Sequence, residues 1–557
     1  MNEGKKIVNY APILGRIIIL NTRRPSYWSS ELITLLVSLF FTLAYNASFW
    51  ADLLSGKELT SAHTWLIIIC TGIAITGLQW FLLLLVINRW TFRGFMISLF
   101  LVTSIMVYFM NTFHVYIDPN MVTNAISTDY QESKELLQWR IIPYLLLLGV
   151  IPSWIVWNSR IYKRNLLSYW TGRFGCIFLS LLMFLGGGWA VYNDLSPIHR
   201  AKKEIVYLVT PLNLFSSSAK AYWRAQRTKA SQTRKLIAKD AQQLPRSVGA
   251  KPRAIVLVIG ETVRAANWGL GDYSRQTTPE LAKHQLINFS QVSSCGTSTA
   301  VSLPCMFSPY GLRHYDEKRI KQSESFLHLL NRLNISVLWR DNQSGCKGVC
   351  DGLPMEKLKI EAMCKNGRCF DEILLHQLKE KISSVKGDQL IVLHMLGNHG
   401  PAYYERYPEQ FKRWQPTCDT ADLASCSPES IVNTYDNAIL YTDTVLARAL
   451  DELSTITTHD TGLIYVSDHG ESLGEHNLFL HGLPYFMAPD EQKKVPMIFW
   501  SSKGLSEQLV LDNECMQSKK EQAVSHDYLF STVLSLFDVK TKSYDKKYDL
   551  LHTCRKG

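Results

Sequence analysis

The stretch AIVLVIGET, Ala254–Thr262, decides the fold of the second half of this chain. It is a continuous run of β-branched and apolar residues ending in Gly-Glu-Thr, which is typical of a strand buried on both faces of a largely parallel sheet. Helical stretches such as Ser325–Leu333 and Ile431–Leu453 separate it from similar runs downstream. The alternation predicts an α/β domain. Its further strands are expected at Ser336–Trp339, Leu390–Leu396, Gly462–Gly470 and Val495–Trp500.

Carboxylates and imidazoles follow several of these strands directly. Ligands bind outside the carboxyl ends of strands in open α/β sheets, and this set of side chains suits zinc or a similar divalent ion. A single strand-end Asp more often caps the next helix, so the metal prediction depends on their joint occurrence. The residues are Glu261, His399 in GNHG, Asp468, His469 and Glu471 in DHGE, and His481 in FLHG.

Four hydroxyl residues lie between two cysteines in CGTSTAVSLPC, Cys295–Cys305. The stretch resembles a helix N-terminus, where free amide hydrogens attract phosphate. A hydroxyl that touches a metal there can lose its proton and act as a nucleophile. The alternative is that Ser298 or Thr299 only caps the helix. Spacing alone leaves four candidates open, namely Thr297, Ser298, Thr299 and Ser302.

The first 192 residues contain five long apolar runs. Spanning a bilayer takes about 20 mostly apolar residues, and five runs with so few charges are too many for one soluble core. We therefore predict a five-helix transmembrane domain over residues 1–192 and a catalytic domain over 251–557. Residues 193–250 form either an interfacial bridging segment or a plain basic linker. The runs are Leu32–Trp50, Trp65–Ile87, Phe95–Phe109, Ile141–Trp157 and Gly175–Tyr192.

The basic residues give these helices an orientation. The formal charge of the 557-residue chain is +11, and much of the excess flanks the apolar runs, which argues against a nucleic-acid partner. By the positive-inside rule the N-terminus is cytoplasmic, and everything after Tyr192 lies across the membrane. The cytoplasmic side is set by Lys5, Lys6, Arg16, Arg23, Arg24, Arg89, Arg93, Arg160, Lys163, Arg164 and Arg173, against Lys57, Lys134 and Arg140 in the other loops.

Ten of the 12 cysteines follow residue 290, mostly as close neighbours. An even, clustered set is typical of disulfides in an oxidising compartment, which agrees with the predicted topology. A zinc site at Cys346 and Cys350 is the competing interpretation. Connectivity does not follow from sequence, and pairing of neighbours is the working prediction. It joins Cys295 to Cys305, Cys346 to Cys350, Cys364 to Cys369, Cys418 to Cys426, and Cys515 to Cys554.

Five motifs together resemble one family: IGET, CGTSTAVSLPCMFS, GNHGP, SDHGESLGE and LHGLPY. The chain is similar over nearly its whole length to the lipid A phosphoethanolamine transferases. This membrane family includes polymyxin-resistance enzymes, and its soluble half belongs to the alkaline phosphatase superfamily. The resemblance implies that Thr299 is the nucleophile. It further implies a tight zinc site made by Glu261, Thr299, Asp468 and His469.

The resemblance also assigns residues to the substrate. His399 and His481 match positions that bind the donor phosphate or a second, weaker zinc, and Glu471 and Lys347 match residues lining the donor pocket. Three further positions match contacts to the ethanolamine end. They are Asn124, Thr128 and Glu132, spaced to share one helical face, which from the residues alone would be a solvated face.

The implied reaction moves phosphoethanolamine from phosphatidylethanolamine to lipid A through a covalent phosphothreonine, releasing diacylglycerol. The implied enzyme is a monomeric, multi-pass protein of the bacterial inner membrane, surrounded by lipid, with a periplasmic catalytic domain, and such enzymes give polymyxin resistance. Alternatives are another envelope glycan as acceptor, or a glycerol-phosphate transferase of the lipoteichoic acid synthase type. A sulfatase needs Cys or Ser before Pro-x-Arg, whereas here Pro304 precedes Cys305 with no following Arg. A receptor or transporter is disfavoured because the apolar runs carry almost no charge.

Overall fold

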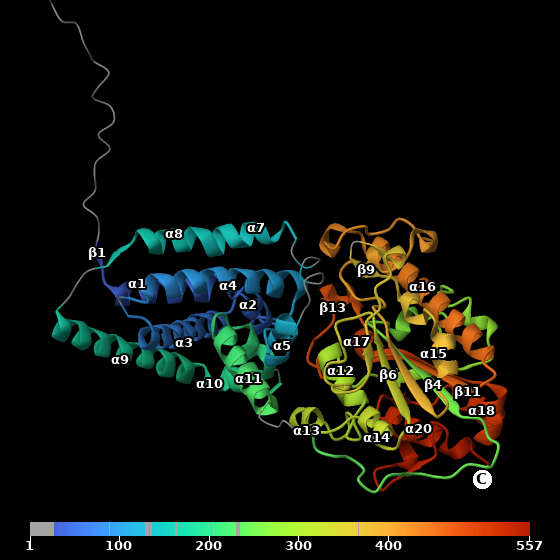
Figure 1. The fold of residues 1–557 in the computed structure, drawn as a ribbon. Helices are drawn as coiled ribbons and strands as arrows, with labels where there is room; N and C mark the ends of the chain where they lie inside the picture. The colour runs from blue at the N-terminus through green and yellow to red at the C-terminus, as the bar shows by residue number, and fades with distance from the viewer. Residues whose placement is uncertain are drawn as a thin grey trace, which may run out of the picture. The chain divides into compact units, whose positions relative to one another are not determined.

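A computed structural model describes residues 27–88, 90–127, 133, 136, 138–161, 165–201, 203–229, 234–365 and 367–556 (Figure 1). The chain packs as two compact units. One comprises Met1–Val107 and Ile142–Lys203, and the other comprises Tyr108–Ile141 and Glu204–Gly557. Packing therefore divides the chain differently from the predicted segments 1–192, 193–250 and 251–557. The loop after the third apolar run and most of the connecting segment belong with the α/β unit.

The apolar runs form long helices. Four of them are long and apolar enough, among the described residues, to cross a membrane: α3 (Ala62–Val86), α4 (Phe92–Phe113), Ile141–Asn158 and Leu167–Ala190. Helices α3 and α9 (Leu166–Ala190) pack closely because glycines leave room. A Cβ on Gly77 would lie 2.7 Å from the Phe184 nitrogen, and one on Gly187 would lie 2.6 Å from the Cys70 oxygen.

The first predicted run is a bent pair rather than one straight helix. It consists of α1 (Ser30–Ala44) and α2 (Ala47–Leu53), which meet at 57° and make a fifth span if they cross together. Asn46 lies at the break, and its side-chain amide donates to the Phe41 carbonyl at 2.8 Å. A short polar side chain that bonds the backbone in this way competes with helix continuation.

The orientation of these helices stays a prediction. Of the basic residues that set it, Lys5, Lys6, Arg16, Arg23, Arg24, Arg89, Lys134, Lys163 and Arg164 lie outside the described residues. The remaining helices of this unit are α7 (Ile141–Tyr144), which continues through η1 (Leu145–Val150) into α8 (Ile151–Asn158), and α10 (Tyr192–Ala201).

An eight-stranded sheet forms the middle of the second unit, in the order β15-β5-β14-β11-β4-β10-β6-β7. The predicted strands are confirmed as β4 (Arg253–Gly260), β6 (Ser336–Asp341), β10 (Gln389–His394), β11 (Asp460–Ser467) and β14 (Lys494–Ser501). Strand β4 is parallel to both β10 and β11, whereas β14 is antiparallel to its neighbours. The strands of this sheet that were not predicted are β5 (Ile287–Ser293), β7 (Met355–Glu356) and β15 (Val524–Ser525).

Helices cover both faces of the sheet, which explains why β4 is apolar without alternation. Ile255, Leu257 and Ile259 point into one core, with α14 (Phe326–Arg332) and α20 (Tyr528–Leu536). Ala254, Val256 and Val258 point into the other, with the long α16 (Pro428–Ser454). The shorter helices of this unit are α13 (Glu317–Gln322), α15 (Leu378–Ser384), α17 (Asp490–Lys493), α18 (Lys503–Gln508) and α19 (Asn513–Ser518). Three two-stranded pairs also belong to it: β3 (Gln242–Gln243) with β16 (Val539–Lys540), β8 (Cys364–Lys365) with β9 (Arg368–Cys369), and β12 (Ser472–Leu473) with β13 (Phe479–Leu480). A fourth pair, β1 (Tyr27–Trp28) with β2 (Arg160–Ile161), belongs to the helical unit.

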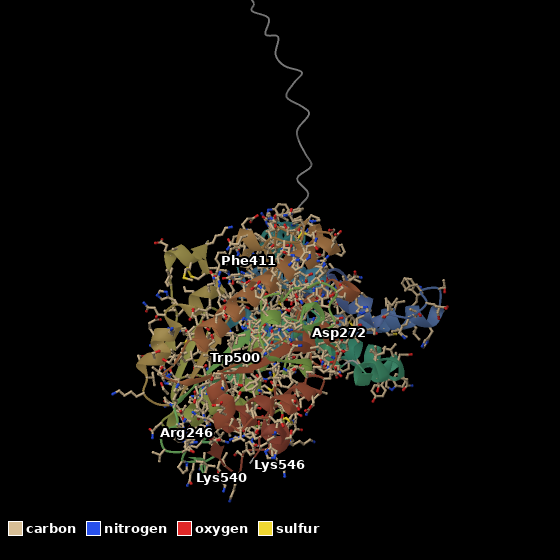
Figure 2. All side chains as sticks on the ribbon, turned by 90° about the vertical axis from the view of Figure 1, so that its right-hand side faces the viewer. Arg246, Asp272, Phe411, Trp500, Lys540 and Lys546 are labelled. Carbon is tan, nitrogen blue, oxygen red and sulfur yellow. A yellow bond between two sulfur atoms is a disulfide. The ribbon has the colours of Figure 1, made fainter. Side chains whose placement is uncertain are left out.

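The two ends of the sheet differ in character. Trp500 of β14 pairs with Leu463 near the start of β11, so it marks the amino-terminal end of the parallel strands. Figure 2 looks onto this side of the molecule, with Trp500 near its middle and Arg246, Lys540 and Lys546 along its lower rim. The carboxyl ends, where the predicted site residues lie, are at the opposite end of the strands.

All five predicted disulfides are present: 295–305, 346–350, 364–369, 418–426 and 515–554. Cys346 and Cys350 are therefore bonded to each other, and the zinc-pair interpretation of these two residues is wrong. Cys70 and Cys176, which take no part in these disulfides, lie in α3 and α9.

The basic connecting segment contains helix α11 (Leu212–Lys229). Its Ser217 hydroxyl donates to the Ile117 carbonyl at 2.7 Å, and the helix packs on α5 (Pro119–Ser127). Tyr222 and Trp223 remain exposed on it. Contact of this helix with a bilayer stays a prediction.

Candidate active site

Strand register brings the predicted rim residues together. Ser467 pairs with Gly260 at the ends of the parallel strands β11 and β4, so Asp468 and Glu261 emerge side by side. The Thr262 amide donates to Asp468 Oδ1 at 3.2 Å, and the Asp468 amide donates to the Gly260 carbonyl at 2.9 Å. Both carboxylates are fully buried.

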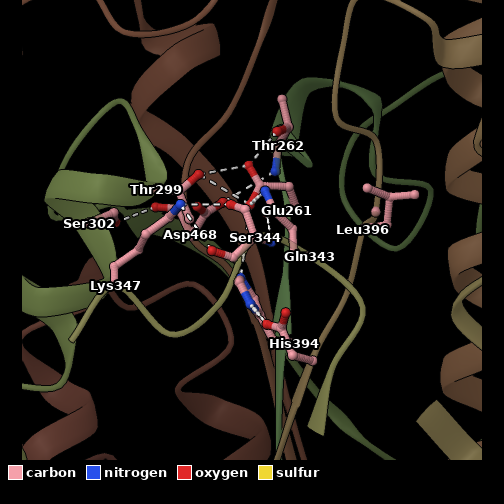
Figure 3. Close-up of polar contacts among 12 residues, drawn as sticks. Glu261, Thr262, Thr299, Ser302, Gln343, Ser344, Lys347, His394, Leu396 and Asp468 are labelled. Carbon is pink, nitrogen blue, oxygen red and sulfur yellow. Dashed lines mark hydrogen bonds and ion pairs between the residues drawn. The ribbon is translucent and has the colours of Figure 1, made fainter. Parts of the chain in front are cut away.

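Thr299 is the first residue of α12 (Thr299–Met306), as the predicted helix N-terminus requires, and Ser298 holds the N-cap position without a side-chain capping bond. Thr299 Oγ1 lies 3.1 Å and 3.2 Å from the two carboxylate oxygens of Glu261, and 3.5 Å from His469 Nε2 (Figure 3). Two other candidate hydroxyls are engaged elsewhere. Thr297 donates to the Leu483 carbonyl and Ser302 donates to the Asp468 carbonyl, each at 2.5 Å. Thr299 is therefore the candidate whose hydroxyl faces the carboxylate and imidazole cluster.

Glu261, Asp468 and His469 fit a divalent cation. Each offers one ligand atom, these atoms lie within 4.8 Å of one another, and all three side chains are buried. His469 Nε2 lies 3.2 Å from Glu261 Oε1 and 3.4 Å from Asp468 Oδ2. Asp468 Oδ2 has no hydrogen-bond partner among the described residues, which is a costly arrangement for a buried carboxylate oxygen. A bound cation would satisfy it.

The electrostatics of the cluster show the same need for positive charge. Burial raises the pKa of Asp468 to about 7, and the nearby charge of Glu261 adds to that effect. Burial would lower the pKa of His469, but Asp468 and Glu261 outweigh it and raise that pKa to about 10. Burial also opposes ionisation of Glu261, yet its bond to and the charge of His469 hold its pKa well below the ordinary value. The two buried carboxylates, Glu261 and Asp468, therefore share the single positive charge of the His469 imidazolium.

Sequence reasoning missed His394, the last residue of β10. Its Nδ1 lies 2.8 Å from Asp341 Oδ1, and its Nε2 lies 4.0 Å from Glu261 Oε2 (Figure 3). Gln343 Nε2 donates to the same Glu261 oxygen at 3.0 Å. An imidazole inside the buried run LIVLHML was the signal that could have identified His394, whereas Gln343 lies in a loop and gives no comparable signal.

His399, His481 and Glu471 form a second group beside the first. The rings of His469 and His481 have centroids 4.3 Å apart, and those of His481 and His399 are 5.6 Å apart. His481 Nδ1 lies 3.4 Å from Glu471 Oε2. Burial raises the pKa of Glu471 well above its ordinary value, whereas burial and the charge of His469 lower the pKa of His481 to about 3. A neutral imidazole is the form that binds a metal or accepts a hydrogen bond.

Lys347 lies in the short loop closed by the 346–350 disulfide, with φ +47°. Its ammonium donates to the Ser344 hydroxyl at 2.6 Å. Figure 3 shows the side chain reaching toward Thr299 and Asp468. The predicted donor-pocket lysine therefore points at the cluster from its own loop.

The third predicted group is only partly described. Asn124 lies in α5, which contacts α12, the helix that begins at Thr299. Thr128 and Glu132 lie outside the described residues. Their predicted shared helical face stays a prediction.

Comparison with known proteins now identifies the family. Residues 75–226 match the family "Phosphoethanolamine transferase EptA/EptB", and residues 253–539 match the sulfatase family. Phosphoethanolamine transferase EptA of Escherichia coli K12 is 37% identical over 529 residues, covering 94% of this chain and 96% of that protein. The chain belongs to the EptA family of phosphoethanolamine transferases.

A solved relative agrees with the EptA assignment over nearly the whole chain. The integral membrane lipooligosaccharide phosphoethanolamine transferase A of Neisseria meningitidis superposes with a TM-score of 0.90 at 34% identity, covering 96% of this chain and 100% of that one. Phosphatidylethanolamine transferase Mcr-2 of E. coli is 35% identical over 90% of this chain and 94% of its own. The sulfatase match therefore describes the fold of the α/β unit of an EptA-type protein.

Proposed function

We propose that this EptA-family chain transfers phosphoethanolamine from phosphatidylethanolamine to lipid A through a covalent intermediate on Thr299, releasing diacylglycerol. One observation carries the proposal. Of the hydroxyls in CGTSTAVSLPC, that of Thr299 faces the carboxylate of Glu261 and the ring of His469, at the start of a helix. Nucleophilic catalysis by a hydroxyl requires a group that takes up its proton and a site that attracts the phosphate.

In the first step the Thr299 oxygen attacks the donor phosphorus. The Glu261 carboxylate, 3.1 Å away, accepts a hydrogen bond from the Thr299 hydroxyl. This bond leaves a lone pair of the Thr299 oxygen directed at the donor phosphorus. The phosphorus–oxygen bond to diacylglycerol breaks, and the leaving oxygen takes the proton that the Thr299 hydroxyl gives up. In the second step an acceptor oxygen attacks the same phosphorus, the bond from phosphorus to the Thr299 oxygen breaks, and that oxygen takes the proton that the acceptor gives up.

Zinc is the metal we propose for the cluster, in one tight site. Glu261, Asp468 and His469, with the Thr299 hydroxyl, would hold it. When bound, it supplies positive charge that lowers the pKa of the hydroxyl and stabilises the transferring phosphoryl oxygens. Mixed carboxylate and imidazole donors are ligands that zinc accepts.

The substrate-facing residues have separate roles in this proposal. His399 and His481 bind the phosphoryl oxygens or a second, weaker zinc, and Glu471 orients His481 from 3.4 Å. The Lys347 ammonium, which comes from the loop closed by the 346–350 disulfide, neutralises part of the negative charge of the donor phosphate. Contacts to the ethanolamine end come from Asn124, Thr128 and Glu132.

Lipid A is proposed as the acceptor because the name of one relative refers to lipooligosaccharide and that of another to Kdo(2)-lipid A. One is the lipooligosaccharide transferase of N. meningitidis. The other is Kdo(2)-lipid A phosphoethanolamine 7''-transferase of E. coli K12, 27% identical over 77% of this chain and 79% of its own. Capping an anionic phosphate with a cationic amine weakens the attraction of polymyxin, which would give resistance.

We place the enzyme in a bacterial inner membrane as a monomer, with the N-terminus cytoplasmic and the α/β unit in the periplasm. The five disulfides support the oxidising compartment. The two-unit packing supports a membrane anchor joined to a folded catalytic unit.

Mass spectrometry of lipid A tests the proposal. Cells that express the chain should gain lipid A heavier by one phosphoethanolamine group, and cells that express Thr299→Ala should not. Thr297→Ala is the matched control, because its hydroxyl bonds a backbone carbonyl outside the cluster. Modification confined to core sugars would contradict lipid A as acceptor. Unmodified envelope lipids in wild-type cells that contain the folded protein would contradict the transfer itself.

A further inference from the structure

His526 precedes α20, far along the chain from Thr299, and the proposed mechanism does not use it. We infer that His526 is a positioning residue that holds the start of α12, and so Thr299, against the end of β11, which presents Asp468. The inference rests on the proposed role of Thr299. It deepens that role by naming the group that sets the position of the nucleophile.

One buried imidazole contacts three segments of the site. His526 Nδ1 lies 3.0 Å from the Cys295 nitrogen and 3.3 Å from Ser302 Oγ, and its Nε2 lies 2.9 Å from the Ser467 carbonyl. The residue is 1% exposed. Ser467 directly precedes Asp468, and Ser302 lies one helical turn after Thr299. The ring therefore spans the turn before α12, the first turn of α12 and the end of β11.

The contacts determine which ring nitrogen carries the hydrogen. A carbonyl only accepts, so Nε2 donates to Ser467, and Nδ1 accepts the amide hydrogen of Cys295. Burial lowers the pKa of His526 to about 3, so the ring is neutral and has a single N–H. The Ser302 hydroxyl donates to the Asp468 carbonyl at 2.5 Å, which ties α12 to the ligand strand beside the ring.

The chain places His526 here through a short parallel strand. In β15, Val524 and Ser525 pair with Val292 and Ser293 of β5, and the His526 amide donates to the Ser293 carbonyl at 3.1 Å. The register thus delivers residue 526 to the turn that begins at Ser294, next to Cys295. Non-local pairing of this kind explains why the SHD triplet at 525–527 gave no signal in the sequence.

The neighbouring Asp527 holds the chain beyond the other end of α12. Its carboxylate accepts from the amides of Leu312 at 2.6 Å and Arg313 at 3.2 Å. A Cβ on Gly311 would lie 2.1 Å from Asp527 Oδ1, so the close approach requires glycine there, at φ +59°. The two adjacent residues thus hold the segments before and after the nucleophile helix.

Two substitutions separate the two nitrogens. His526→Asn keeps an acceptor oxygen near the Nδ1 position and removes the Nε2 donor, whereas His526→Gln keeps a donor near Nε2 and removes the acceptor. Full-length protein in detergent is assayed for transfer from phosphatidylethanolamine. We expect His526→Gln to lower kcat about 100-fold with little change in KM, because a small misplacement of a reacting group costs about that much. His526→Asn loses the contact with the Ser467 carbonyl of β11, so it should lower kcat to a similar extent.

His459 supplies the matched control. It is also buried, at 3% exposure, and it contacts Gln389 Nε2 at 3.1 Å and Thr458 Oγ1 at 2.9 Å, next to the start of β11. His459→Asn and His459→Gln should lower thermal stability as the His526 variants do while leaving kcat unchanged. A wild-type kcat in either His526→Asn or His526→Gln would overturn the inference, because each variant breaks one end of the bridge. So would losses that track the fall in Tm in both the His526 and His459 series.

Failure of the proposed function has a different signature. Thr299→Ala, assayed in parallel, should show no transfer. Transfer by Thr299→Ala at the wild-type rate would contradict the nucleophile itself, and with it the inference, whatever the His526 variants do.

Discussion

The disulfide between Cys295 and Cys305 encloses the start of the nucleophile helix α12. Its removal should lower the transfer activity more than the accompanying loss of stability would explain. The change is the double variant Cys295→Ala/Cys305→Ala. Cys305 lies within α12, and the amide of Cys295 is held by His526. Without the bond, the turn that places Thr299 loses one of its fixed ends.

The magnitude follows from loop length, because a crosslink mainly restricts the unfolded chain. The 295–305 bond closes a separation of 10 residues and is worth about 2.7 kcal/mol at 25 °C in the chain-entropy account. The 515–554 bond closes 39 residues and is worth about 3.9 kcal/mol by the same relation. Cys515→Ala/Cys554→Ala is therefore the matched control, and it should be the less stable protein.

The assay compares the two double variants. Full-length protein is unfolded with guanidinium, and the unfolding is monitored by hydrogen exchange in peptides from β4 and β11. The midpoint gives the stability of the α/β unit. Transfer activity is measured well below both midpoints. We expect the 515–554 variant to lose more stability and keep its activity, and the 295–305 variant to lose less stability and most of its activity. Activity losses ranked in the same order as the stability losses would refute the positioning argument.

Two further changes test the metal cluster and a buried carboxylate apart from it. Glu261→Gln should purify without tightly bound zinc by elemental analysis, while Glu356→Gln, which breaks a pair with Arg340, should keep it; full zinc occupancy in Glu261→Gln would show that the ligand assignment is wrong. Asp443 accepts the amides of Glu280 and Leu281, and burial raises its pKa to about 7. The folded state thus binds its proton more tightly than the unfolded state, so its contribution to stability is present at pH 4 and lost as pH rises through 7. Asp443→Asn should flatten the fall in Tm between about pH 4 and 7, and an unchanged slope there would contradict the raised pKa.

Local pattern was sufficient for the parts of the fold that depend on local residues. The apolar run before Glu261 and the run before Asp468 fix where two strands end, so the cluster at the carboxyl rim could be predicted from the sequence. Pairing of neighbouring cysteines could be predicted because closing a short loop costs the least chain entropy. The bend at Asn46 was missed because the apolar run continues through it, and only the side-chain bond to Phe41 shows the break.

Choices that depend on distant residues could not be made from the sequence. Four hydroxyls competed in one stretch, and the contacts of Thr299 with Glu261 and His469 exist only once β4, β11 and α12 are assembled. His526 reaches the site through the two-residue strand β15, which is too short to show a hydrophobic pattern.

Trapping the covalent intermediate tests the central claim most directly. Full-length protein is incubated with phosphatidylethanolamine and no acceptor, digested, and its peptides are sequenced by mass spectrometry. We predict phosphoethanolamine on Thr299, present also in Thr297→Ala and absent from Thr299→Ala. Modification of Ser298 or Thr297 would contradict the assigned nucleophile, and continued transfer without any adduct would contradict covalent catalysis and favour direct attack by the acceptor.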